Sequence, residues 1–139
     1  MPYPGVRGML AALDSPNPPD FVWITPNLQN DMHDGSVTRG DAWLAANLPA
    51  VLASRWFDDG SVIVTMDEND ASSSGSCCGG AHGGRVPMVV ISARAQARGA
   101  IATPGDHYGT LRSIEAVFGL RFLGNAARIQ NGDLSSLFG

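Results

Sequence analysis

Two adjacent carboxylates, Asp67 and Glu68, form the clearest candidate for chemistry in the sequence. They follow Val62–Thr65, an apolar and β-branched run that predicts a buried strand. Because α/β proteins place their sites just beyond the carboxyl ends of such strands, we expect both acids at a functional edge. Two carboxylates there indicate a hard divalent cation or acid–base catalysis. The alternative is a polar turn that only ends the strand.

Composition restricts the remaining chemistry. The chain has 139 residues, a formal net charge of −4 and nine basic residues, all of them arginine and scattered along the sequence. This composition fits one globular domain and gives no basic stripe for nucleic acid. Lysine is absent, which excludes a Schiff-base mechanism and the lysine of a phosphate-binding P-loop.

Membrane and export signals are not convincing in this sequence. No apolar run approaches the roughly 20 residues that a transmembrane helix needs. Residues 1–13 are short and broken by Pro and Gly, so they do not form a convincing signal peptide.

Hydrophobic periodicity predicts three strands and two helices. The strands are expected at Phe21–Thr25, Ser61–Met66 and Pro87–Ser92. One helix is expected over Trp43–Trp56, where Pro49 should bend or split it. The final helix should stop at Gly119 and carry an apolar face made of Leu111, Ile114, Val117 and Phe118.

This order of elements implies an α/β fold with a parallel or mixed sheet and helical crossovers. The nearly continuous apolar runs predict strands that are covered on both faces, yet two helices are too few to cover them. We therefore expect apolar surface or an unpaired strand edge, which favours self-association. Trp23, Trp43 and Trp56 fall at strand or helix positions where we expect packing.

Four segments, taken in order, carry a resemblance to a known family. They are residues 25–34, 64–68, 85–92 and 106–115. Together they resemble the second half of the phosphoesterase family, which contains bacterial acid phosphatases and phospholipases C of the alkaline-phosphatase-like superfold. The run from Phe118 to Leu120, with Leu123–Ala126, is similar to the C-terminal signature of that family. The resemblance implies a partial alkaline-phosphatase-like fold, in which residues 1–19 are an irregular Pro-rich lead-in and residues 20–139 are the C-terminal part of a phosphoesterase domain.

The resemblance also implies roles for particular residues. Asp67 and Glu68 match a pair that contributes to a metal site, and the cofactor would be a divalent metal ion. His33 matches a catalytic histidine beside the substrate phosphate, and His107 matches a second histidine on the substrate side. The implied activity is metal-dependent hydrolysis of phosphoric esters, of the acid phosphatase or phospholipase C type. Taken alone, His33 would be interpreted as a surface loop histidine.

One departure from the family concerns its opening motif. Family members begin with a segment like Glu-Asn-x-Ser/Thr, and their nucleophile lies in the first half. Here the only glutamates are Glu68 and Glu115, so that motif is absent. We therefore expect this chain to be the C-terminal part of a hydrolase, and we expect it to need the N-terminal half of the enzyme as a partner. The alternative is an inactive fragment that serves as a binding or interaction module. Family members are often exported, whereas residues 1–13 of this sequence do not form a convincing signal peptide.

A second metal site could be read into Cys77, Cys78 and His82. Adjacent cysteines do not have the spacing of a zinc site, so this interpretation is disfavoured.

Overall fold

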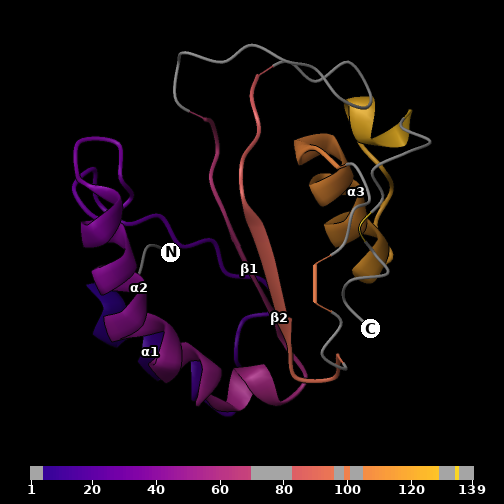
Figure 1. Ribbon diagram of the computed structural model, residues 1–139. Coiled ribbons are helices and arrows are strands. Elements are labelled where there is room, and N and C mark those ends of the chain that lie inside the picture. The colour runs from indigo at the N-terminus through magenta and orange to yellow at the C-terminus, as the bar shows by residue number, and fades with distance from the viewer. Residues whose placement is uncertain (1–4, 70–82, 96–98, 101–104, 129–133, 135–139) are drawn as a thin grey trace. The chain divides into compact units, whose positions relative to one another are not determined.

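The computed structural model describes residues 5–69, 83–95, 99–100, 105–128 and 134. The chain divides into two compact units, Met1–Gly60 and Ser61–Gly139 (Figure 1). Within the described residues, no helix is both long enough and apolar enough to cross a membrane.

The first unit is helical. Helix α1 spans Gly5–Leu13, helix α2 spans Val37–Leu52, and a 3-10 turn, η1, spans Arg55–Asp58. Helix α1 packs against α2 (Figure 1), and the buried apolar side chains among the described residues of this unit are Met9, Leu13 and Val51. Because α1 lies inside residues 1–19, the expectation of an irregular lead-in is wrong for that part of the segment.

Helix α2 begins earlier than the apolar periodicity indicated. Its N-cap is Ser36, whose hydroxyl accepts a hydrogen bond from the Arg39 main-chain N–H at 3.3 Å. Ser at this position satisfies one of the unpaired N–H groups at a helix start. Pro49 lies inside α2, which ends at Leu52, so the predicted Trp43–Trp56 helix is divided into α2 and η1.

Residues 21–25 are not a strand in the structure, which corrects the first of the three predicted strands. Phe21 and Trp23 lie with their rings 6.5 Å apart, and the Trp23 side chain is 74% exposed. The expected packing role is therefore wrong for Trp23. Trp56 is partly buried, and its indole N–H donates to the Pro19 carbonyl at 2.8 Å.

The second unit contains the sheet. Strand β1 spans Ser61–Thr65 and strand β2 spans Met88–Ser92, within one residue of the predicted bounds. The two strands pair antiparallel, with Ser61 opposite Ser92 and Thr65 opposite Met88 (Figure 1). The mixed helix and strand content agrees with the predicted α/β class, and the two described strands pair antiparallel where a parallel or mixed sheet was expected. Parallel pairing needs a crossover, and the Ser/Gly-rich connection has no amphipathic helical pattern to provide one.

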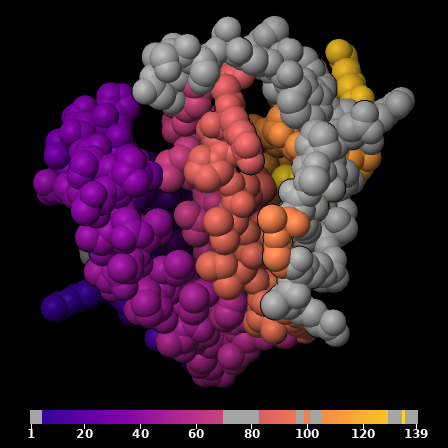
Figure 2. Space-filling model, viewed as in Figure 1, coloured from indigo at the N-terminus to yellow at the C-terminus, as the bar shows by residue number. Residues whose placement is uncertain are grey.

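Neither strand is covered on both faces, which agrees with the expectation that two helices are too few to cover the strands. Every residue of β1 is partly exposed, and Val89 in β2 is 53% exposed. Atoms of β2 lie on the molecular surface in Figure 2. Continuous β-branched runs correctly placed the strands, but they could not predict how much of each strand this chain covers.

Helix α3 spans His107–Val117 and is followed by a 3-10 turn, η3, at Gly124–Ala127. Asp106 caps α3 by accepting a hydrogen bond from the Gly109 N–H at 2.8 Å. Gly119 has φ +63°, which agrees with its predicted role as the helix stop.

The buried face of α3 is more polar than expected. Ser113 is fully buried and Glu115 is 4% exposed, whereas the predicted apolar face is largely exposed at Leu111, Val117 and Phe118. The Glu115 carboxylate accepts from the Leu123 N–H at 3.2 Å, and this contact joins the helix to the following segment. Among the described residues of this unit, the buried apolar ones are Ala126 and Leu134.

Candidate functional site

The segment that leaves β1 is held at both ends by side chains. The Thr65 hydroxyl donates to the Pro87 carbonyl at 2.9 Å, which joins the end of β1 to the residue before β2. On the other side, the Asn69 side-chain oxygen accepts a hydrogen bond from the Gly84 N–H at 2.6 Å. Residues 65–69 are therefore attached to segments 15 and 22 positions away in the sequence.

A third hydrogen bond lies between these two anchors. The His107 Nε2 atom is 2.8 Å from the main-chain oxygen of Asp67, although the residues are 40 positions apart. A carbonyl oxygen can only accept, so Nε2 must carry the hydrogen. The first residue of α3 is thus bonded to the main chain of the acid pair.

The side chains of Asp67 and Glu68 remain exposed beyond this fixed main chain. Within the described part of the chain, neither carboxylate makes a hydrogen bond or an ion pair. Exposed, neighbouring oxygen ligands suit a hard divalent cation, so the donor chemistry fits the expected metal. The described residues contain no group of three or more His, Cys, Asp or Glu side chains that could complete a metal site.

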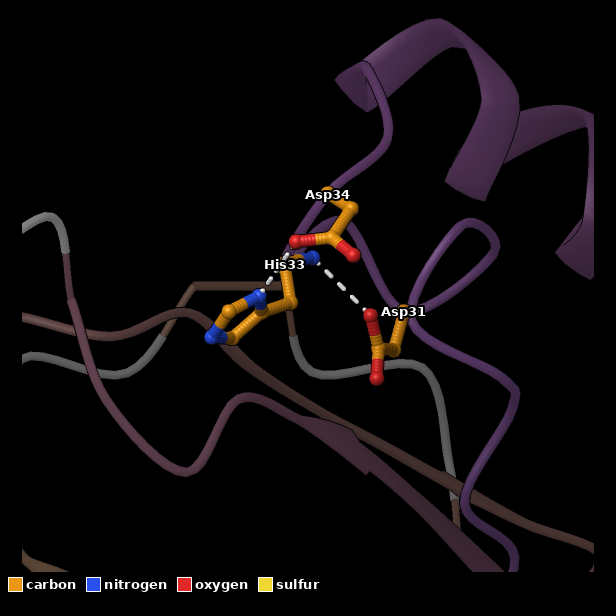
Figure 3. Close-up of polar contacts among 3 residues, drawn as sticks. All are labelled: Asp31, His33 and Asp34. Carbon is orange, nitrogen blue, oxygen red and sulfur yellow. Dashed lines mark hydrogen bonds and ion pairs between the residues drawn. The ribbon is translucent and has the colours of Figure 1, made fainter.

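His33 lies in a compact loop before α2 (Figure 3). Its Nδ1 atom is 2.9 Å from the Asp34 carboxylate, and its main-chain N–H donates to Asp31 Oδ1 at 2.9 Å. Asp31 and Asp34 contact the main chain and the ring of His33 respectively (Figure 3). Because an ionised carboxylate only accepts, Asp34 holds the hydrogen on Nδ1 and leaves the lone pair of a neutral ring on Nε2.

The main chain of this loop is tightly turned. The Asn30 N–H donates to the side chain of Asn27 at 3.1 Å and to its carbonyl at 2.8 Å. Met32 has φ +78°, the only positive φ outside glycine in the described residues. Its side chain packs over Gly40, where an added Cβ would come within 2.5 Å of Met32 Cγ. The absence of a side chain at Gly40 therefore leaves the space that the Met32 side chain occupies.

The predicted site residues are divided between the two units. His107 contacts the Asp67–Glu68 segment in the second unit, while His33 belongs to the first unit. Sequence analysis did not identify Thr65 and Asn69 as anchors, because their partners lie far along the chain. The contact of Asp34 with His33 could have been suspected from the sequence, because the two residues are adjacent. Cys77, Cys78 and His82 lie outside the described residues.

Comparison with known proteins identifies the family of the chain. The sequence profile of the phosphoesterase family matches residues 6–121, which is most of the chain. This chain belongs to the phosphoesterase family. The match begins before Asp20, so the family similarity extends further toward the N-terminus than the motifs alone indicated.

Curated phosphoesterase relatives are considerably longer than this chain. It is 33% identical over 111 residues to a phosphatidylinositol-3-phosphatase of Mycobacterium tuberculosis, with 80% of this chain and 34% of the relative covered. It is 30% identical over 108 residues to an acid phosphatase of Aspergillus fumigatus, with 76% and 23% covered. The chain therefore spans about a third or less of the length of these relatives. No solved structure matches it significantly.

Proposed function

We propose that this chain supplies the metal-binding part of an enzyme that hydrolyses phosphoric esters, of the acid phosphatase or phospholipase C type. Relatives named as phosphatases support the reaction class. The observation that carries the proposal is the Asp67–Glu68 pair, with exposed carboxylates on a main chain that is held by His107. Such a pair can hold a cation without first losing other contacts.

In this proposal Asp67 and Glu68 provide oxygen ligands for a divalent cation. When bound, the cation would reduce the charge of the phosphate ester and orient the attacking oxygen. Two carboxylates leave several coordination positions unfilled, so binding by the chain alone should be weak. Further ligands would come from sequence that corresponds to the family's first half.

His33 is the proposed acid–base residue. The contact with Asp34 fixes the ring orientation and directs the chemistry to Nε2. From there a protonated ring can donate to a phosphate oxygen or protonate the leaving alcohol. The Asp31 contact with the His33 N–H holds the main chain in place while the proton moves.

The nucleophile is proposed to come from outside these 139 residues. The sequence has no Glu-Asn-x-Ser/Thr segment, and cation binding without an attacking group gives little rate. We therefore expect activity only when the chain works with the family's nucleophile-bearing half, in the same or a neighbouring polypeptide.

The test is a hydrolysis assay with p-nitrophenyl phosphate on the chain joined to, or mixed with, that half. Activity should disappear with EDTA and return with a divalent cation, and Asp67→Asn should lower kcat by roughly 10²-fold or more. Asp58→Asn removes the same charge at an exposed position in η1 and should leave kcat unchanged. The isolated 139-residue chain should give only the background rate.

Three outcomes would count against the proposal. Hydrolysis that continues in EDTA would show that the reaction does not need a metal ion. A normal kcat in Asp67→Asn would show that Asp67 is not a metal ligand. No hydrolysis by the complete protein would favour a binding or interaction module. A parallel assay with phosphatidylcholine separates the two substrate types, because a phospholipase C cleaves this diester and a monoester phosphatase does not.

A further inference from the structure

His107 contacts the acid pair through the main chain and not through a carboxylate. Its Nε2–H donates to the Asp67 carbonyl at 2.8 Å. That carbonyl and the N–H of Glu68 belong to the same peptide unit, which is planar. A hydrogen bond that fixes the direction of the carbonyl therefore fixes the plane that joins the two acids.

The orientation of the acid pair depends on this peptide plane. Both side chains are exposed, and within the described residues neither is held by a hydrogen bond or an ion pair. The anchors at Thr65 and Asn69 hold the segment on either side, but they do not act on the peptide between Asp67 and Glu68. Of the contacts described, the His107 bond alone acts on that peptide.

Hydrogen bonds at the start of α3 hold the main chain on either side of His107. His107 is the first residue of the helix, and the preceding Asp106 accepts from the Gly109 N–H at 2.8 Å. The Asp106 carbonyl also accepts from the Thr110 N–H at 2.9 Å and from the Thr110 hydroxyl at 3.1 Å. These bonds define the helix start and therefore the main-chain position from which the His107 side chain reaches the Asp67 carbonyl.

We propose that His107 is a positioning residue, which orients the Asp67–Glu68 peptide for cation binding in place of contacting the substrate phosphate. The inference rests on the proposed role of the acid pair in binding a cation. Groups that orient metal ligands without touching the metal commonly change metal affinity when they are replaced. Here the oriented group is the peptide between two ligands, and the orienting group is an imidazole N–H.

Mn²⁺ binding by the 139-residue chain tests this inference, because Mn²⁺ prefers oxygen ligands and broadens the NMR signals of nearby amides. His107→Ala should weaken Mn²⁺ binding roughly 10-fold. His107→Gln places an amide N–H near the position of Nε2 and should restore most of the affinity. His107→Asn is too short to reach the carbonyl and should behave like the alanine variant. Tyr108→Phe, at the next residue of the same helix start, is the matched control and should bind normally.

Two further measurements make the result decisive. Imidazole nitrogen NMR should show the proton of neutral His107 on Nε2, both in the unmodified chain and in Asp67→Asn, because that variant retains the carbonyl. Asp67→Asn and Glu68→Gln should each weaken Mn²⁺ binding. If they do not, the proposed cation site fails and the positioning role fails with it.

A different pattern would overturn the positioning role alone. If the carboxylate variants weaken binding but His107→Ala does not, His107 does not orient the pair. If the Ala, Gln and Asn variants all lose affinity equally, the donor N–H is not the important group. Circular dichroism of the Gln and Asn variants identifies any loss of fold, and a folded Gln variant without rescue also rejects the proposal.

Discussion

The residues of the candidate site are oriented in two different ways. Asp67 and Glu68 depend on contacts made by their main chain, so their carboxylates remain available for a ligand. His33 instead depends on a side-chain contact, because Asp34 lies 2.9 Å from its Nδ1 atom. Replacing Asp67 should therefore remove a ligand with little effect on folding. Replacing Asp34 should leave His33 present but less well oriented.

Asp34→Asn tests the orientation of His33. An asparagine amide can turn its oxygen or its nitrogen toward Nδ1, so the ring is no longer held in one tautomer. We expect kcat of the complete enzyme to fall by about 10-fold, a part of the roughly 10²–10⁴-fold that acid–base catalysis contributes. KM should change little, because the substrate phosphate still meets the same ring.

The control for this prediction is Asp41→Asn on the exposed surface of α2, which makes the same charge change. Equal kcat values for Asp34→Asn and the unmodified enzyme would show that Asp34 does not orient His33 for catalysis.

At the scale of elements, local sequence patterns predicted where strands and helices lie, but they did not predict how distant elements pair. The β-branched runs located β1 and β2, and Gly119 marked the end of α3. The antiparallel pairing of β1 with β2 was not predicted, because an apolar β-branched run locates a strand without giving the direction of its partner. The prediction of a strand at residues 21–25 failed because that segment has no strand partner among the described residues.

The same distinction applies to the candidate site. Exposure of Asp67 follows from its place at the end of a strand and could be predicted from sequence. The contact between His107 and the Asp67 carbonyl joins residues 40 positions apart and depends on where α3 begins. Periodicity predicts that a helix exists more reliably than it predicts its first residue. The N-cap therefore decides which side chain reaches Asp67.

Substitution of Asp106 tests the start of α3. Asp106→Ala removes the acceptor for the Gly109 N–H and should lower the free energy of unfolding by about 1 kcal/mol. Asp106→Asn retains a capping oxygen and should change the free energy of unfolding by only a few tenths of a kcal/mol, because Asn and Asp cap helices about equally well. Urea denaturation of both variants provides the measurement.

The second carboxylate oxygen of Asp106 gives this comparison a further use. Oδ2 is buried and has no hydrogen-bond partner among the described residues. If Asp106→Asn is as destabilising as Asp106→Ala, capping does not explain the role of Asp106 and Oδ2 is the atom that matters.

At the scale of the whole molecule, the described residues expose many large apolar side chains. The first unit exposes Phe21, Trp23, Ile24 and Leu28, and the second exposes Leu111, Val117, Leu120 and Leu123. The buried apolar residues of the described chain are few: Met9, Leu13, Val51, Ala126 and Leu134. Many exposed and few buried apolar side chains are expected if these surfaces pack against further parts of a longer protein, similar in length to the relatives. Without that partner, the same surfaces are available for contacts between copies.

We therefore expect the isolated 139-residue chain to self-associate. Sedimentation velocity should show a weight-average mass that rises with concentration, and an apolar dye should bind with increased fluorescence. Trp23→Ser should reduce both effects, because the Trp23 ring is 74% exposed and its loss removes apolar surface without opening a core cavity. Thr38→Ala, at an exposed polar position in α2, should leave both unchanged. A compact monomer at every concentration, without dye binding, would show that the exposed apolar residues do not drive association.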